Sequence, residues 1–298
     1  MAKPTKGKVL DPSLTEPINN DAPPTIYGSS LTPELANAAL NLSVDFVKQQ
    51  QSLANKYILW HPYTLSLVFI SLAVYLGPNV TLPQGTHSVF DFLFQLAIMN
   101  GTQIATSIMV VGISTSVVFT FLTRFTEDLF KKKSRQIVDT NGVNVFNVDL
   151  TKLAKREIKQ KSDTNNTQII VYRETPIALA SIVENTVLSS KDSLVMGISS
   201  IGCRRVYVQS GIIEDLIDWA LIRTKNIQQS GSYKADNSMK VLIDVYSFDK
   251  YMKETLKKKG FSLLSTYDLE DSKLLSKIYG VKRELWGVQF HFEGKKDK

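Results

Sequence analysis

Two long apolar segments in the first half of the chain constrain its fold more than any other feature. Residues 59–76 contain no Asp, Glu, Lys or Arg, and neither do residues 104–122. As a helix, the first segment reaches about 27 Å, which is close to the hydrocarbon thickness of a bilayer. We therefore predict two membrane spans, at residues 58–77 and 92–123.

The alternative to two spans is a helical hairpin buried inside a soluble protein. Trp60 and Tyr63 stand at one end of the first segment and Tyr75 at the other, as is typical of the interfacial zones of a membrane. The remaining sequence offers no equally long apolar faces that would enclose such a hairpin. The spanning interpretation is therefore favoured, and the lipid bilayer is an expected partner.

Positive charge predicts the orientation of the two spans. The connecting loop, residues 78–91, has no Lys or Arg, whereas residues 124–139 are basic. Because basic residues stay on the cytosolic side, we expect both termini in the cytosol and the loop in the lumen. Asn79 opens a glycosylation sequon in that loop, so close to the bilayer that we expect poor occupancy. The basic residues beside the spans are Lys48, Lys56, Arg124, Lys131, Lys132, Lys133 and Arg135.

The segments before the first span carry two different patterns. Residues 1–30 are interrupted by prolines and poor in large apolar side chains, which predicts a disordered cytosolic tail. Residues 31–57 predict an amphipathic helix that starts near Thr32 and Pro33. That helix lies either on the membrane surface or on the domain that follows, and the sequence leaves both positions open.

The last residues, 294–298, contain a dilysine pattern. Lys295 and Lys296 stand fourth and third from the carboxyl end, an arrangement that coat proteins read in the cytosol as a return address to the endoplasmic reticulum. The signal acts only on a membrane protein whose tail is cytosolic, which is the orientation that the basic residues predict. We therefore expect an endoplasmic-reticulum membrane protein with two spans and coat proteins among its partners.

Three polar side chains interrupt the second predicted span. Gln95, Asn100 and Gln103 fall near one face of a helix. Side-chain amides in lipid seek hydrogen-bond partners and so favour contact between helices. They either contact the first span, lie at the lumenal interface, or grip the transmembrane helices of a client protein.

Composition excludes several functions. The net charge is +7, but the sequence has no signature of nucleic-acid recognition, so we expect no nucleic-acid partner. The single cysteine, Cys203, excludes an internal disulfide and a cysteine-based zinc site. The three histidines are scattered without ligand spacing. We predict neither a metal nor a cofactor.

Residues 140–293 alternate between helical and strand patterns and predict a cytosolic α+β domain with a mixed sheet. The order from residue 169 is a hairpin, two strand–helix units and a final strand pair. This order resembles the GNAT superfamily of acetyltransferases. The predicted strands are 142–149, 169–173, 177–187, 193–208, 240–246, 261–267 and 284–292, and the predicted helices are 149–161, 212–225 and 248–259.

The resemblance extends to the acyl-CoA loop of that superfamily only in part. Gln209, Ser210 and Gly211 stand where the superfamily has its phosphate-binding loop, but a single glycine remains. Glu214 and Asp215 then add negative charge at the start of the following helix, where an anionic cofactor would lie. The loop is therefore interpreted as vestigial.

The superfamily's general acid is also unmatched. Leu256 occupies the position of the tyrosine that protonates the leaving thiolate, and Tyr251, one turn earlier, is expected to face elsewhere. These departures predict a fold retained without its reaction, a pseudoenzyme. A membrane-anchored GNAT-type N-acetyltransferase is the alternative, and a membrane-shaping or tethering protein is a third interpretation.

The whole arrangement resembles the fungal Pho86 family. A cytosolic tail, two spans with a small lumenal loop, a GNAT-like domain and a dilysine end occur in the same order. The resemblance implies an endoplasmic-reticulum chaperone that packages a polytopic inorganic phosphate transporter for export to the plasma membrane. It also implies that the transporter is the client, while the chaperone stays behind.

Overall fold

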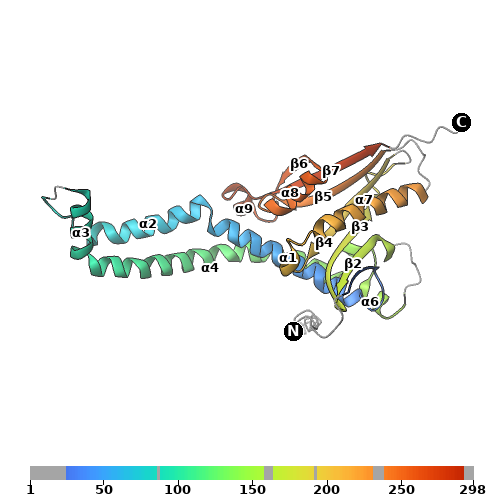
Figure 1. The fold of residues 1–298 in the computed structure, drawn as a ribbon, viewed down its shortest axis with the longest axis horizontal. Helices are drawn as coiled ribbons and strands as arrows, with labels where there is room; N and C mark the ends of the chain where they lie inside the picture. The colour runs from blue at the N-terminus through green and yellow to red at the C-terminus, as the bar shows by residue number, and fades with distance from the viewer. Residues whose placement is uncertain (1–24, 86–87, 158–163, 191–192, 231–237, 292–298) are drawn as a thin grey trace, which may run out of the picture.

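The computed structural model describes residues 25–85, 88–157, 164–190, 193–230 and 238–291. A helical hairpin projects from one end of a domain built on a seven-stranded sheet (Figure 1). The predicted mixed-sheet domain is therefore confirmed. Most of the predicted tail and the dilysine residues, Lys295 and Lys296, lie outside the described residues.

The sheet carries its strands in the order β1-β2-β3-β4-β5-β7-β6. Strands β4 and β5 run parallel, and the other neighbours are antiparallel. The parallel pairing ends at Ile198 and Ile243 although both strands continue, so β4 and β5 separate at one end. The strands are β1 Ile26–Ser30, β2 Thr167–Tyr172, β3 Thr175–Glu184, β4 Ser193–Cys203, β5 Ser238–Tyr246, β6 Ser262–Asp268 and β7 Lys282–His291.

Helices build the hairpin and cover the sheet (Figure 1). One apolar core joins α1, α4, α5 and α6 to β2 and β3, and a second joins α7 and α8 to β4 and β5. The helices are α1 Ala36–Leu59, α2 Pro62–Asn79, α3 Val89–Met99, α4 Gly101–Asp139, α5 Val143–Phe146, α6 Leu150–Ala154, α7 Ile212–Ser230, α8 Lys250–Lys258 and α9 Lys273–Lys277.

Strand β1 lies before the hairpin in the chain, where we predicted a disordered tail to residue 30. It pairs with β2 from Ile26 opposite Tyr172 to Ser30 opposite Gln168, so the prediction is wrong for these residues. The strand is an exposed sheet edge without an alternating apolar pattern, and only its distant partner defines it. The sheet domain is thus assembled from both sides of the hairpin, not from residues 140–293 alone.

Helix α1 packs on the sheet, which decides between the two positions that the sequence left open. Its buried side chains include Leu42, Phe46 and Ile58. The ring of Phe46 lies over Gly202 of β4, where an added Cβ would come within 2.7 Å of it. The helix begins at Ala36 rather than at residue 31, because the preceding residues form a turn. Its amphipathic pattern reflects burial against protein.

Two local predictions in the region after the hairpin are wrong. The predicted strand at 142–149 is the short helix α5, bounded by left-handed residues Gly142 (φ +81°) and Asn147 (φ +57°). Both left-handed positions turn the chain sharply, which an extended strand does not permit. Helix α6 ends at Ala154, so the predicted helix at 149–161 is shorter than expected.

Candidate functional site

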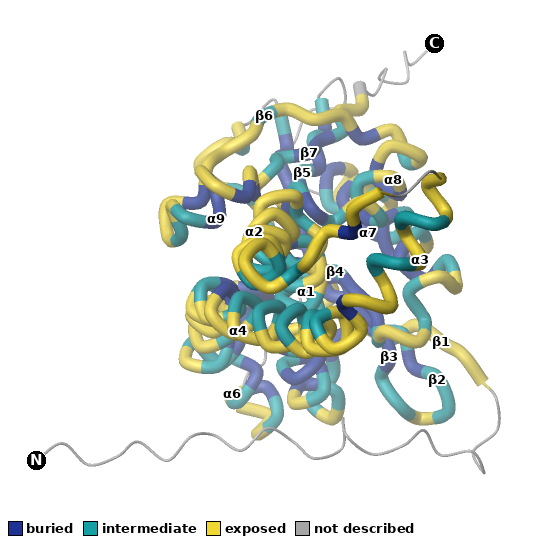
Figure 2. The backbone as a smooth tube through the Cα atoms, turned by 90° about the vertical axis from the view of Figure 1, so that its left-hand side faces the viewer, coloured by how far each residue is buried: buried dark blue, intermediate teal, exposed yellow. Residues whose placement is uncertain are grey.

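The hairpin presents apolar side chains to its surroundings instead of enclosing them. Helix α4 is long and apolar enough to cross a membrane, and the most apolar stretch of it is 0% buried. Helices α1 and α2 meet the same criterion together, with a 48° bend between them. Phe69 and Ile108, for example, are 69% and 71% exposed. Figure 2 shows much of α2 and α4 in the colour of exposed residues. A core helix of a soluble protein would instead be mostly buried.

The bend between α1 and α2 marks the passage from the sheet domain into the hairpin. The His61 side chain caps α2 by accepting a hydrogen bond from the Tyr63 backbone N–H at 3.4 Å. Thr64 is buried, and its hydroxyl donates to the Ile58 carbonyl at 2.7 Å. Pro62 occupies the first helical position, where a missing N–H costs nothing. The bend is therefore a built feature with its own hydrogen bonds.

Asn100 breaks the predicted second span in two. It separates α3 from α4, and α3 lies across the far end of the hairpin (Figure 1). The Asn100 carboxamide accepts from the Thr81 backbone N–H at 2.8 Å and donates to the Thr81 carbonyl at 2.9 Å. Asn100 is buried, so its side chain joins the loop after α2 to the break between α3 and α4 and does not face outward. A continuous span from residue 92 to 123 was therefore a wrong prediction.

The break also separates the three polar residues that were expected on one helical face. Gln95 lies on α3 and donates to Asp91 at 3.0 Å, whereas Gln103 lies on α4 and accepts from Thr102 at 2.7 Å. Helices α2 and α4 contact through another pair: the hydroxyls of Tyr75 and Thr106 share a hydrogen bond at 2.5 Å. Hydroxyl rather than amide chemistry thus links α2 to α4.

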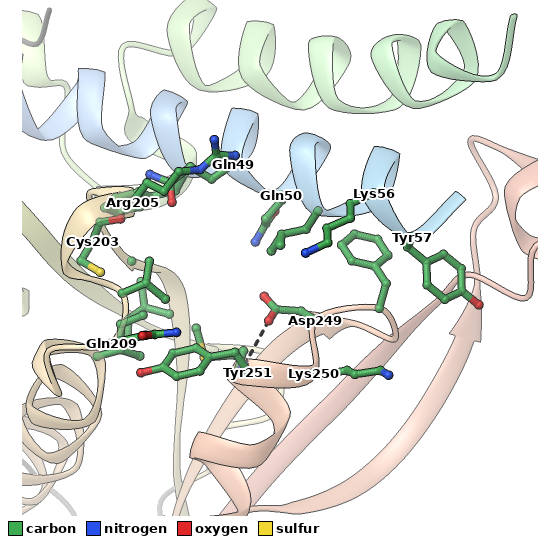
Figure 3. Close-up of a pocket in the computed structure, with 18 of the residues that line it drawn as sticks. Gln49, Gln50, Lys56, Tyr57, Cys203, Arg205, Gln209, Asp249, Lys250 and Tyr251 are labelled. Carbon is green, nitrogen blue, oxygen red and sulfur yellow. Dashed lines mark hydrogen bonds between the residues drawn. The ribbon is translucent and has the colours of Figure 1, made fainter. Parts of the chain in front are cut away.

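A groove of about 1100 Å³ lies between α1, the end of β4 and the start of α8 (Figure 3). The part of β4 that borders it, from Ile201 to Cys203, lies beyond the last pair with β5. Its walls are largely apolar, and basic side chains stand among them, together with Asp249. Residues that line it include Phe46, Leu53, Lys56, Trp60, His61, Cys203, Arg205, Gln209, Phe248, Lys250 and Tyr251.

The loop that was interpreted as vestigial borders this groove. Gln209 lines the groove, and Gly211 adopts a left-handed φ of +84° directly before α7. The Ser210 hydroxyl donates to the Tyr207 carbonyl at 2.6 Å. Tyr251 also lines the groove, and its hydroxyl donates to Glu214 at 3.3 Å, so the expectation that Tyr251 faces elsewhere was wrong. Tyr251 is the second residue of α8, and no local spacing in the sequence places it in the groove.

Burial shifts the pKa values of three groove residues, Cys203, Tyr251 and Asp249, upward. Burial, and next the charge of Glu214, raise the pKa of the Cys203 thiol to about 12. Burial and Glu214 also raise the pKa of Tyr251, and burial raises that of Asp249. Leu256 is fully buried in the core and has no proton to give. The groove therefore holds no thiolate nucleophile at neutral pH.

Gln50 and Asp249 were not foreseen as groove residues. Asp249 caps α8 by accepting from the Met252 backbone N–H at 3.0 Å. In the described part of the chain, the buried side-chain oxygen of Gln50 has no hydrogen-bond partner. The described residues also include no group of three His, Cys, Asp or Glu placed to hold a metal ion.

One family model covers nearly the whole chain. The family described as "Inorganic phosphate transporter chaperone Pho86" matches residues 8–290. The match therefore includes the hairpin and both parts of the sheet domain. No curated protein is similar enough to the chain to count as a relative.

Solved structures with some similarity to the chain are acetyltransferases. An acetyltransferase of the GNAT family from Streptococcus pneumoniae is 12% identical over 48% of this chain and 75% of its own, with a TM-score of 0.34. Naa50 of Arabidopsis thaliana is 13% identical over 42% and 72%, with a TM-score of 0.32. IAA acetyltransferase of Bacillus cereus is 16% identical over 42% and 77%, with a TM-score of 0.32. Similarity at this level assigns no activity to the chain.

Proposed function

The chain belongs to the Pho86 family of inorganic phosphate transporter chaperones, and we propose that it is a resident of the endoplasmic-reticulum membrane. There it prepares a polytopic phosphate transporter for export to the cell surface. The observation that carries the proposal is the exposed apolar hairpin, which lies inside the region that the family model matches. A chaperone for a membrane protein needs a surface that its client's helices can reach within the bilayer.

Hairpin length supports a position across the membrane. The part of α4 from Gly101 to Phe121 is about 31 Å long and that of α2 about 27 Å, against a hydrocarbon core of about 30 Å. Helix α3, with Phe90 and Phe94 exposed, is suited to lie in the lumenal interface. The basic residues that follow Leu122 then face the cytosol, as does the sheet domain.

The proposed client surface is the outer face of the hairpin, formed by α2, α3 and α4. The spans of a transporter carry polar faces that are costly in lipid until they pack. Gln103 on α4 and Gln95 on α3 supply amide groups, and small residues such as Gly112 permit close approach of another helix. Asn100 is no longer a candidate for this role, because both the oxygen and the nitrogen of its carboxamide are hydrogen-bonded to the Thr81 backbone.

The chaperone role is tested by deleting the gene in its own host and measuring phosphate transporter at the surface under phosphate starvation. We expect the transporter to accumulate in the endoplasmic reticulum while other membrane cargo travels normally. Complementation with Gln95→Leu and Gln103→Leu together should restore export poorly. Full export by that double variant would overturn the proposed client contact, and normal delivery in the deletion strain would overturn the chaperone role.

Residence in the endoplasmic reticulum is proposed to depend on coat proteins that bind Lys295 and Lys296. Replacing both by serine should send the protein onward to later compartments, and Lys298→Ser serves as the matched control. Imaging of the tagged protein distinguishes the two outcomes. Unchanged residence of the double variant would show that another signal retains the chain.

We expect the protein to be a pseudoenzyme. The position of Tyr251 in the groove is the reason to test the alternative, an N-acetyltransferase. Its protonated hydroxyl lines the groove beside the vestigial loop. We expect no heat of binding when acetyl-CoA is titrated to millimolar concentration into the full chain in nanodiscs. We also expect Tyr251→Phe to support client export. Saturable binding that Tyr251→Phe leaves intact, with acetyl transfer lost, would establish the enzyme.

A further inference from the structure

A cleft with almost entirely apolar walls lies where the hairpin joins the sheet domain. Its volume is about 620 Å³. Tyr63 and Leu67 of α2 form one wall and Phe121 of α4 another, while Leu274 and Ile278, from α9 and its end, close the third side. The cleft is therefore shared between the membrane hairpin and a loop from the far end of the chain.

Helix α9 is fastened to the base of the hairpin. The Tyr57 hydroxyl donates to the Tyr279 carbonyl at 3.0 Å, and the ring of His61 meets that of Tyr279 edge-on at 5.0 Å. Lys132 of α4 forms an ion pair with Asp271. These contacts hold α9 beside the bend at which the chain enters α2, as Figure 1 shows. The position of α9 relative to the hairpin is therefore fixed by bonds to both α1 and α4.

The outward side of α9 combines apolar and basic groups. Ile278 is 47% exposed although it borders an apolar cleft. Lys273 and Lys277 are exposed on the same short helix, while Leu275 is buried toward the domain. Apolar side chains beside lysines are the pattern of segments that lie in a membrane interface. Glu270 is exposed on the preceding turn, so the local charge is mixed rather than uniformly positive.

The depth of the cleft relative to the bilayer follows from the position of the hairpin. Tyr63 stands in the first turn of α2, and Arg124 lies two residues after Leu122 of α4. If the hairpin spans the bilayer, this turn lies at the cytosolic leaflet, and tyrosine and arginine are typical there. The cleft is continuous with the exposed apolar faces of α2 and α4, so the medium that covers those faces also reaches the cleft.

We propose that α9 is a membrane-contact element of the sheet domain. Ile278 and Leu274 enter the boundary between headgroups and acyl chains, a phospholipid acyl chain fills the cleft, and Lys273 and Lys277 face the phosphates. The inference rests on the proposed membrane position of the hairpin. It adds that the domain lies against the bilayer in one orientation, with the groove at Trp60 opening close to the membrane surface.

Site-directed spin labelling tests the contact on the full chain. Cys203 is the only cysteine, so a Cys203→Ala background accepts one label at a time. Three isoleucines give a matched set: Ile278→Cys at α9, Ile108→Cys in the hairpin and Ile222→Cys on α7, which are 47%, 71% and 59% exposed. Labelled protein is placed in nanodiscs of phosphatidylcholine with a minority of phosphatidylserine, and access to oxygen is compared with access to a water-soluble nickel complex.

We expect the label at 108 to be more accessible to oxygen and the label at 222 to be more accessible to nickel. The ratio of oxygen to nickel accessibility at 278 should lie between the two, closer to the value at 108. A label at 278 as accessible to nickel as the one at 222, with 108 in lipid, would overturn the α9 contact alone. A water-exposed label at 108 would overturn the membrane hairpin and the contact together. Low access of 278 to both reagents would show that protein covers the cleft, which also overturns the lipid assignment.

Discussion

The hairpin and the sheet domain use the same apolar residue types with opposite placement. Leu179 and Ile169 in the sheet are fully buried, whereas Phe69 and Ile108 in the hairpin are largely exposed. In water the first arrangement is favourable and the second is not, since burial of apolar surface drives folding. The sheet domain thus encloses its apolar side chains, whereas the hairpin leaves them exposed, although one helix, α4, runs through both regions.

Polar groups show the same contrast. In the sheet domain, the hydroxyls of Thr167 and Ser181 pair in the core at 3.0 Å. In the hairpin, hydroxyls such as those of Ser71 and Ser107 donate to carbonyls of their own helix, and Asn100 binds the Thr81 backbone at the far corner. Lipid offers no hydrogen bonds to compensate an open polar group. Polar groups that are satisfied within the hairpin are what the proposed membrane position requires.

The largest expected effect is the loss of a core side chain. Leu179→Ala in β3 should lower the free energy of unfolding by about 2–5 kcal/mol, because the cavity adds to the lost burial. Leu67→Ala in α2, where leucine is 50% exposed, should change the stability of the sheet domain by less than about 0.5 kcal/mol. Denaturant unfolding of the full chain in detergent, followed by tryptophan fluorescence, gives both values. Equal losses would contradict the contrast between the two regions.

An aspartate introduced into each region tests whether the position is surrounded by lipid or by water. Ile108→Asp should raise the apparent free energy of membrane insertion of α4 by about 2.5–3.5 kcal/mol. Ile222→Asp on α7 exposes its carboxylate to water and should leave insertion and stability unchanged. Insertion into microsomes with a glycosylation reporter measures the first effect. Insertion of Ile108→Asp as efficient as that of the original chain would mean that α4 does not cross the bilayer.

The contact between α1 and the sheet joins the two regions, and a single methyl group should loosen it. Gly202→Ala places a Cβ within 2.7–2.9 Å of the Phe46 ring, and overpacking of this kind costs about 1–3 kcal/mol. Gly197→Ala on the same strand meets only the Val183 carbonyl at 3.8 Å and is the matched control. Thermal unfolding compares the two variants. If Phe46→Leu did not relieve the cost in the double variant, the stated clash would be the wrong cause.

The smallest expected effect concerns the hydrogen bond between the spans. Tyr75→Phe removes the contact with Thr106 and should cost about 0.6 kcal/mol, the average for such bonds between membrane helices. A double-mutant cycle with Thr106→Val isolates the pair. Unfolding in sodium dodecyl sulfate provides the measurement. A coupling energy as large as the loss in Leu179→Ala would show that the hairpin depends on this bond far more than its exposed faces suggest.

Local patterns predicted much of the sheet domain. The strands near 169–173 and 240–246 and the helix near 212–225 were read from apolar periodicity, and β2, β5 and α7 lie there. The helix predicted at 248–259 corresponds to α8, and Gly260 lies just past its end with a left-handed φ of +82°, as is typical of glycines that end helices. These signals succeed because side chains on one face of an element meet the core at a fixed spacing.

Tertiary contacts decided the parts that the patterns missed. Asn100 reads as a polar residue inside a span, and only the nearby Thr81 backbone makes it a corner. Tyr251 enters the groove because α8 is placed against Glu214 of α7. In each case the residue that fixes the position lies at least 19 residues away in the sequence, so the local spacing of side chains could not predict the contact.

Two apolar uncharged segments and a mixed α/β domain after them could be predicted from the amino-acid order, because both depend on side chains along short stretches. The insertion of the hairpin within the sheet domain, between β1 and β2, became visible only in the folded chain. The edge strand Ile26–Ser30 joins β2 through backbone hydrogen bonds, and every residue except proline carries the same donor and acceptor.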